Sequence, residues 1–376
     1  MANKQQGTNI EVKKNNRNRI FRYICKHETV SNPDISYQTK MSLPTVTQIT
    51  KELIGKGLVR EVGELKSTGG RRAKALSVAA NARQAVGLDI TKNHISLVLT
   101  NLTGEILRYE RFHYPFTEEE GYYQEVNKKL EDFLDECGAD REKLLGIGIS
   151  FPGIVNLREE RITYSHVLGV KKLPFVSVSR FFSYPCYFIN DANAGAYAEG
   201  IQGERQGRFF YLSLSNTVGG GIFSSGEVEQ GNHFHCGEVG HMTVIPDGKP
   251  CYCGKKGCLD AYCSAKLLAD MTEGSLERFF ALLQQGEKKI CALWEEYTSY
   301  LAVAVNNIHM VLDCDIVLGG YVGSYTEDYI EDIWKKVSGR NTFAEETAFV
   351  RSCRYKVGAA ALGAALKVTE MFIEQV

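Results

Sequence analysis

Three cysteines within eight residues, preceded by a histidine, restrict the fold of this chain more than any other feature. In the segment HMTVIPDGKPCYCGKKGC, His241 is followed by Cys251, Cys253 and Cys258. Thiolates and imidazole are ligands that zinc prefers, and the glycines between them permit a tight turn. Four protein ligands leave no position open for water, so we expect a structural Zn²⁺ ion that folds this loop.

Two other histidines, His233 and His235, compete with His241 as the fourth ligand. Their spacing to the cysteines along the chain is less typical of a zinc site than that of His241, and both could also be ordinary loop residues. The remaining cysteines among the eleven are expected to be buried small side chains rather than disulfides. The polar N-terminus has no signal-like segment and no apolar run approaches the ~20 residues of a membrane helix, so a cytoplasmic protein with no membrane partner is expected.

Charge divides the 376 residues into two unlike parts. Residues 1–83 carry a net charge of +10, whereas the remainder carries −11. A solvated lysine-rich surface could explain a few surplus positive charges, but it explains a surplus of ten less well. A basic module on an acidic body is typical of a polyanion-binding head carried by another domain.

Serine and proline mark two helix starts in the basic part. The tetrapeptides SNPD (31–34) and SLPT (42–45) each place a capping serine before a proline in the first turn. Together with an apolar periodicity between Asn15 and His27, they predict three helices, over about 15–27, 31–40 and 42–55. Strand-like runs follow at 58–62 and 75–78. This order predicts a winged helix-turn-helix DNA-binding domain over residues 1–80.

The third predicted helix has an outer face suited to DNA. Val46, Ile49 and Leu53 cluster on the side that must face the core. The cap and outer face carry hydroxyls, an amide and a cation, the groups that contact bases and phosphates: Ser42, Thr45, Thr47, Gln48 and Lys51. A merely solvated helix would more commonly carry Glu and Lys. In the predicted wing, Arg71 and Arg72 follow two glycines and could enter a minor groove, although a solvated basic hairpin explains them equally well in isolation.

From residue 85 the pattern changes to alternating strands and helices. An antiparallel meander (86–89, 95–99 and 106–107) is followed by strands at 145–150, 186–190, 209–214 and 316–318. Helical stretches are expected near 121–137, 265–285 and 291–312. The sequence predicts a two-lobed mixed α/β domain with glycine-rich loops at strand ends, where ligand sites form.

Several motifs in this body resemble the ROK family, which comprises repressors, open reading frames and kinases. They are SFPG (150–153), NDAN (190–193), GEVGH (237–241), the cysteine segment, VLGG (317–320) and the glycine- and alanine-rich helix from Gly358. The resemblance implies an actin-like (ribonuclease H-like) sugar-kinase fold over 85–376. Its first lobe would span about 85–192 with the last helix, 357–375, and its second about 193–356, with the zinc knuckle at 241–258. The added DNA-binding module is typical of the xylose and N-acetylglucosamine repressor branch.

The resemblance also assigns a sugar site. Asp191 matches the general base of the kinases, here expected to be vestigial, and Asn190 and Glu238 match groups that bind sugar hydroxyls. Asp260 stands where the family usually has a glutamate, and His166 where kinases often have an asparagine. The complete expected set is Gly153, Asn190, Asp191, Glu238, His241 and Asp260. Alternatively, Asp191 caps a helix and Glu238 forms a surface ion pair.

Both phosphate loops depart from the kinase pattern. The first reads Asp89-Ile-Thr-Lys-Asn-His94, in which side chains replace the usual glycines, and the second reads Ser215-Asn-Thr-Val218 before its glycines. Backbone amides can cradle phosphates only where no side chain intrudes. We therefore expect a repressor that has lost catalysis, with Zn²⁺, an operator DNA and a sugar as partners, acting as a homodimer, with a tetramer as the alternative. An ATP-dependent sugar kinase, or a regulator controlled by a protein partner, are the alternatives.

Overall fold

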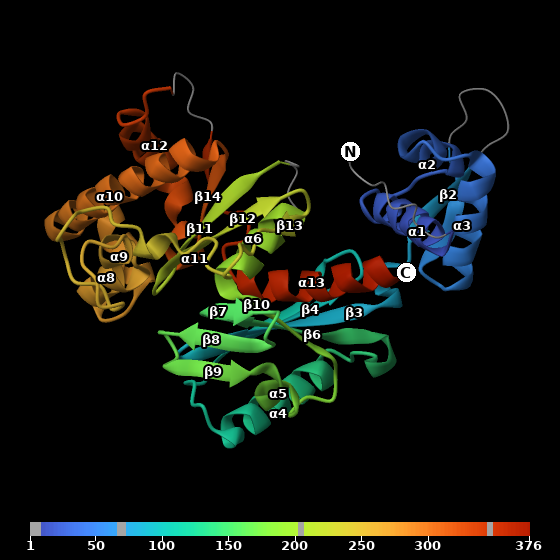
Figure 1. Ribbon diagram of the computed structural model, residues 1–376, viewed down its shortest axis with the longest axis horizontal. Helices are drawn as coiled ribbons and strands as arrows, with labels where there is room; N and C mark the ends of the chain where they lie inside the picture. Colours follow the sequence, from blue (N-terminus) through green and yellow to red (C-terminus); the bar gives the residue numbers. More distant parts are fainter. Residues whose placement is uncertain (1–8, 66–72, 202–206, 344–348) are drawn as a thin grey trace.

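The computed structural model describes residues 9–65, 73–201, 207–343 and 349–376. The N-terminal module contains three helices followed by an antiparallel hairpin, as predicted for a winged helix-turn-helix (Figure 1). These elements are α1 (Asn9–Cys25), α2 (Asn32–Thr39), α3 (Leu43–Gly55), β1 (Val59–Glu64) and β2 (Lys74–Val78). Arg71 and Arg72 lie outside the described residues.

Both predicted serine caps are present. The Oγ atom of Ser31 accepts from the backbone N–H of Asp34, whose carboxylate accepts in turn from the N–H of Ser31, 3.0 Å away. The Oγ atom of Ser42 accepts from the N–H of Thr45. These bonds satisfy amides that have no partner within the helix, and so fix where α2 and α3 begin.

The first lobe contains a five-stranded sheet in the order β10-β6-β3-β4-β5, with β10 and β6 parallel to β3. Its strands are β3 (Gln84–Ile90), β4 (His94–Asn101), β5 (Ile106–His113), β6 (Leu144–Phe151) and β10 (Cys186–Asn190). One face packs on α4 (Glu120–Glu136) and α5 (Phe175–Ser179) through a continuous apolar core. A small antiparallel sheet that the sequence reading did not anticipate adjoins this lobe: β7 (Ile154–Asn156), β8 (Arg161–Ser165) and β9 (Val170–Pro174).

The second lobe contains a sheet in the order β13-β12-β11-β14-β15. Its strands are β11 (Phe209–Leu214), β12 (Val218–Ser224), β13 (Glu227–Val228), β14 (Asp315–Gly319) and β15 (Val350–Ser352). The helices of this lobe are α7 (Asp260–Cys263), α8 (Ala265–Ala269), α9 (Leu276–Gln284), α10 (Lys288–Leu312), α11 (Gly320–Gly323) and α12 (Ile330–Ser338). Together with the sheet they enclose the largest apolar cluster.

The helical stretch expected over 265–285 is broken into two helices. Glu273 and Gly274 have φ angles of 56° and 91°, which end the first segment in left-handed backbone. Ser275 then caps α9 by accepting from the N–H of Arg278. A glycine followed by serine was the signal for this break, because glycine is favoured after a helix and serine before one.

Two helices lie between the sheets of the two lobes. Helix α13 (Ala359–Gln375) covers the first sheet, and α6 (Asp191–Ile201) covers the second (Figure 1). They pack so closely that a Cβ atom on Gly363 would lie 1.7 Å from the carbonyl oxygen of Ala194. Helix α13 therefore links the two lobes through backbone-to-backbone contact.

The C-terminal end of α13 also enters the core of the N-terminal module. Ile373 and Val376 pack in one apolar cluster with Phe21 of α1 and Leu53 of α3. Arg22 of α1 forms an ion pair with Glu370 of α13. Among the described residues, no helix combines the length and apolar character needed to cross a membrane.

Candidate functional site

A cavity of about 340 Å³ opens at the carboxyl end of β10. Parallel strands β6 and β10 end here, the position at which α/β sheets commonly bind ligands. The carboxyl and carboxamide groups of the cavity come from Asn190, Asp191 and Glu238. Its lining also includes Gly153, Tyr164, His166, Thr217, Gly219, His235, His241 and Tyr252.

Asn190 and Asp191 are held rigidly at the junction of β10 and α6. The Nδ2 atom of Asn190 donates to the carbonyl oxygen of Gly153 at 3.0 Å and to Oδ1 of Asp191 at 3.0 Å. The same Oδ1 accepts from the backbone N–H of Ala192 at 2.9 Å. One oxygen of the carboxylate is thus fixed by the protein, while the residue lines the cavity.

Burial shifts the titration of both cavity carboxyls. Burial, reinforced by the nearby charge of Asp89, raises the pKa of Asp191 to about 7. Burial also raises the pKa of Glu238. Acceptor groups of raised pKa in a confined cavity are suited to hydrogen bonding with a ligand rather than to a structural ion pair.

Most of the expected sugar set is brought together, but Asp260 is not among the cavity-lining residues. Gly153, Asn190, Asp191, Glu238 and His241 all line the cavity. The carboxylate of Asp260 accepts instead from the backbone N–H of Val218, 2.6 Å away. Asp260 therefore fixes the start of β12, from which Gly219 and Gly220 face the cavity.

Aromatic side chains complete the cavity. His166 lies on its wall, as the resemblance suggested, and its Nδ1 is 2.7 Å from the hydroxyl of Tyr164. Tyr252 also lines the cavity, although sequence reasoning did not select it. The signal for it was its place between Cys251 and Cys253, since a zinc ion held by both would fix this residue.

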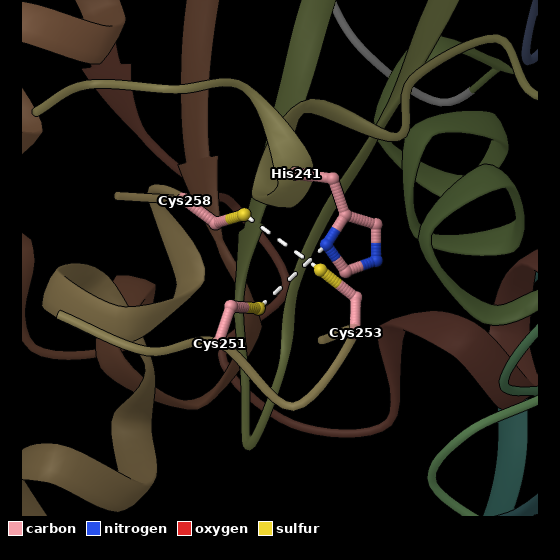
Figure 2. A group of neighbouring side chains, drawn as sticks. All are labelled: His241, Cys251, Cys253 and Cys258. Atoms are coloured by element: carbon pink, nitrogen blue, oxygen red, sulfur yellow. Dashed lines mark hydrogen bonds between the residues drawn. The ribbon is translucent and has the colours of Figure 1, made fainter. Parts of the chain in front are cut away.

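The predicted metal ligands converge beside the cavity. His241, Cys251, Cys253 and Cys258 each offer one ligand atom, and these four atoms lie within 4.8 Å of one another (Figure 2). Neither His233 nor His235 belongs to the group, and His235 lines the cavity instead. The Sγ atoms of Cys253 and Cys258 are 3.8 Å apart, close to the ~3.8 Å edge of a tetrahedron with Zn–S bonds of about 2.3 Å. Three sulfurs and one imidazole nitrogen at this spacing fit a closed zinc site.

Backbone hydrogen bonds shape the loop that carries these ligands. The N–H of Cys251 donates to the carbonyl of Lys255 at 2.8 Å, and the N–H of Gly254 to that of Cys251 at 3.0 Å. Gly257 has a φ angle of 79°, and a Cβ atom there would lie 1.7 Å from the carbonyl oxygen of Ile245. Only glycine permits this approach, so the loop geometry depends on it.

Helix α3 presents a second candidate surface, which carries the residues expected to contact DNA. A shallow hollow is lined by Leu43, Pro44, Thr47, Gln48 and Lys51, while Val46, Ile49 and Leu53 face the core as predicted. The single acid of this helix, Glu52, pairs with Lys13 and Arg17 of α1. The hydrogen bond from Lys13 lowers the pKa of Glu52. The hydroxyls of Ser42 and Thr45 lie 2.8 Å apart and bond to each other.

Comparison with known proteins is consistent with this geometry. The model of the ROK family matches residues 85–370. The chain belongs to the ROK family. A putative xylose repressor of Caldicellulosiruptor sp. (strain Rt8B.4) is 29% identical over 370 residues, covering 92% of each chain.

Two solved structures resemble the chain to different extents. A ROK family transcriptional regulator, described as a homolog of the E. coli MLC protein, has a TM-score of 0.80 and 22% identity, covering 96% of this chain and 97% of that chain. A ROK hexokinase from Thermus thermophilus has a TM-score of 0.63 and 28% identity, covering 78% of this chain and 100% of that chain. The ROK fold therefore serves both regulators and kinases, and the regulator matches more of this chain.

Proposed function

We propose that this ROK protein is a sugar-responsive transcriptional repressor that binds operator DNA as a homodimer and has lost kinase activity. The observation that carries this proposal is the cavity itself, which brings together the acceptors Asn190, Asp191 and Glu238, while the backbone amides of Thr91 and Val218 in the two altered loops are already bonded within the protein.

Asn190, Asp191 and Glu238 suit a polyhydroxy ligand. Asp191 and Glu238 each offer a carboxylate oxygen to a hydroxyl, and Asn190 offers the second lone pair of an Oδ1 atom that already accepts from the N–H of Asn193. Asn190 and Asp191 are fixed in place by bonds to the backbone. A hydroxyl buried without a partner costs about 1–3 kcal/mol, so several fixed acceptors discriminate for a sugar. Sugars are the molecules handled by the kinase and the putative xylose repressor that this chain resembles.

In each of the two altered loops that resemble the phosphate loops of the kinases, one backbone amide is already bonded within the protein. The turn after β3 is closed by Thr91, whose N–H and hydroxyl both donate to the carbonyl oxygen of His94 at 2.9 Å. In the second loop, the carboxylate of Asp260 occupies the N–H of Val218. A phosphate approaching that amide would meet a carboxylate in place of a donor, which opposes phosphoryl transfer.

Helix α13 offers a route from the sugar cavity to the DNA-binding module. Asp191 begins α6, α6 packs on α13, and the end of α13 lies in the apolar core of the module. A sugar that bridges Asp191 of α6 and Glu238 of the second lobe would draw the lobes together and displace the module. The state that matches two operator half-sites would then be less populated.

The test is DNA binding in the presence of sugars. Duplexes selected from a random pool with the full-length protein supply the probe, and anisotropy measures its affinity with D-xylose, D-glucose and N-acetyl-D-glucosamine. We expect one sugar to weaken binding at least fivefold in the wild type and not in Asp191→Ala, with Glu331→Gln, an exposed carboxyl on α12, as control. Selection of no duplex, or no effect of any of the three sugars, would reject the proposal.

Kinase activity is the competing function, favoured by the similarity to the T. thermophilus hexokinase. Titration with Mg-ATP, with and without each sugar, separates the two functions. We expect no nucleotide binding and no ADP release. ADP release that depends on both sugar and Asp191 would establish the kinase instead.

A further inference from the structure

The ligand cavity has one side rich in aromatic rings, and those rings come from both lobes. Tyr164 lies in β8 of the first lobe and His166 directly follows this strand, whereas Tyr252 belongs to the cysteine loop of the second lobe. The ring centroids of His166 and Tyr252 are 4.9 Å apart, with an interplanar angle of 72°. This edge-to-face contact joins the two lobes beside the cavity.

Tyr252 is not buried by these neighbours. Its ring also lies 5.3 Å from that of His241, yet the residue remains 46% exposed. An aromatic side chain that lines a cavity and keeps this much exposed surface retains ring area for a ligand. Ordinary core packing would have covered it.

The carboxyl and carboxamide groups of the cavity come from three other lining residues, Asn190, Asp191 and Glu238. A sugar ring has the same division, since hydroxyls extend from its edge while its two faces present carbon–hydrogen bonds. Aromatic rings attract such weakly positive hydrogens through the negative charge of their faces. The cavity thus has complementary surfaces for both parts of a cyclic sugar.

We propose that Tyr252 and His166 form an aromatic wall, in which the ring of Tyr252, supported by its edge-to-face contact with His166, packs against a carbon–hydrogen face of the bound sugar ring, so that the zinc loop contacts the sugar directly. This inference rests on the proposed sugar-binding function and adds a specificity-determining residue to it. Cys251 and Cys253 flank Tyr252, so a metal ion bound by both cysteines would fix the position of the tyrosine ring. Through this ring, the metal site would favour cyclic sugars over open-chain polyols.

Calorimetric titration of the full-length, zinc-loaded protein tests the wall. The probes are D-xylose, D-glucose and N-acetyl-D-glucosamine, with xylitol and sorbitol as open-chain counterparts of the first two. We expect Tyr252→Phe, which keeps the ring, to bind within about twofold of the wild type, and Tyr252→Ala to bind about tenfold more weakly. The preference for sugar over polyol should shrink in Tyr252→Ala.

Lys255→Ala is the matched control, because Lys255 is an exposed residue of the same loop and does not line the cavity. Zinc content should remain one ion per chain in every variant. If Tyr252→Ala loses zinc, His166→Ala tests the same wall from the opposite lobe, with an expected loss of about fivefold.

The outcomes separate this inference from the function on which it rests. Sugar binding that needs Asp191 but is unchanged in both Tyr252→Ala and His166→Ala rejects the wall alone. A wild type that binds none of the three sugars rejects the wall and the proposed function together. Equal loss in Tyr252→Phe and Tyr252→Ala would assign the effect to the hydroxyl and overturn the stacking role.

Discussion

Asp191 combines two properties that normally oppose each other in a folded protein. The proposed function needs its carboxylate as an acceptor in the cavity, yet burial and the neighbouring Asp89 disfavour its charge and raise its pKa to about 7. In the proposed repressor, which needs no general base, such a cost is retained only for binding. The residue should therefore show opposite effects on stability and on affinity.

Substitution Asp191→Asn separates these effects. The folded state holds the proton more tightly than the unfolded state, whose pKa is near the ordinary 3.8. The favourable contribution of Asp191 is therefore complete below about pH 4 and is lost as the pH rises through about 7. Asparagine stays neutral and can still accept from Ala192, so the variant should melt higher than the wild type at pH 8.

Thermal melting of the sugar-free protein from pH 5 to pH 8 checks this sign. The gain in melting temperature of Asp191→Asn over the wild type should be small at pH 5, grow towards pH 7 and level off above it. Sugar binding by the variant should be lost at every pH in this range. Asp313→Asn, at the exposed end of α10, is the control. A variant that melts below the wild type at pH 8 would contradict the interpretation.

At the level of elements, the zinc loop shows what the sequence could predict. Ligand types and their spacing correctly predicted that His241 and the three cysteines are neighbours, because a short segment with two glycines has few ways to fold around three cysteines. The preference for His241 over His235 as the fourth ligand, which was based on the spacing to the cysteines, is also confirmed by the positions of these side chains. Contacts between distant segments were beyond such reasoning.

Asp260 and Tyr252 illustrate that limit. Both lie within or just after the cysteine segment, and their roles depend on which way the side chain turns. Asp260 turns towards the amide of Val218, 42 positions earlier in the chain, and Tyr252 towards His166 of the other lobe. Such pairings are set by tertiary packing, so composition and spacing could not reveal them.

Removal of zinc should uncouple the loop from the rest of the protein. A strong chelator, or Cys258→Ser, should abolish sugar binding, because His241 and Tyr252 would no longer be held at the cavity. DNA affinity without sugar should change little, since the helices and hairpin of the N-terminal module lie outside the loop. Cys314→Ser, at a buried cysteine outside the cluster, is the matched variant and should keep its zinc.

Zinc content by atomic absorption and sugar affinity by calorimetry give the two readouts. Loss of zinc together with unchanged sugar affinity would show that the loop folds without the ion. In that case the metal would have no part in forming the cavity.

On the scale of the whole molecule, α13 is the element that contacts both α6, which begins at Asp191, and the N-terminal module. One end covers the first sheet beside α6, and the other lies between α1 and the rest of the body (Figure 1). The pair of Arg22 and Glu370 joins it to α1; the side chain of Glu370 is 11% exposed, whereas that of Arg22 is 38% exposed and also pairs with Glu374. A partly shielded charge pair at a domain contact favours one relative orientation of the two parts.

Substitution Glu370→Gln should therefore weaken communication while leaving both sites intact. Sugar affinity of the DNA-free protein should stay within about twofold of the wild type. The ratio of DNA affinities without and with sugar, expected to be about 5- to 150-fold for ordinary coupling, should fall towards one. Asp270→Asn, which removes the exposed ion pair with Lys266 in the second lobe, is the matched control.

Linkage supplies an internal check, because coupling between two ligands is reciprocal. If sugar weakens DNA binding by a given factor, saturating DNA must weaken sugar binding by the same factor, and Glu370→Gln must reduce both equally. Calorimetry of sugar binding with and without the selected duplex measures the second ratio. An unchanged ratio in Glu370→Gln would exclude this contact as the route, and unequal ratios in the wild type would mean that the sugar acts through a change in assembly as well.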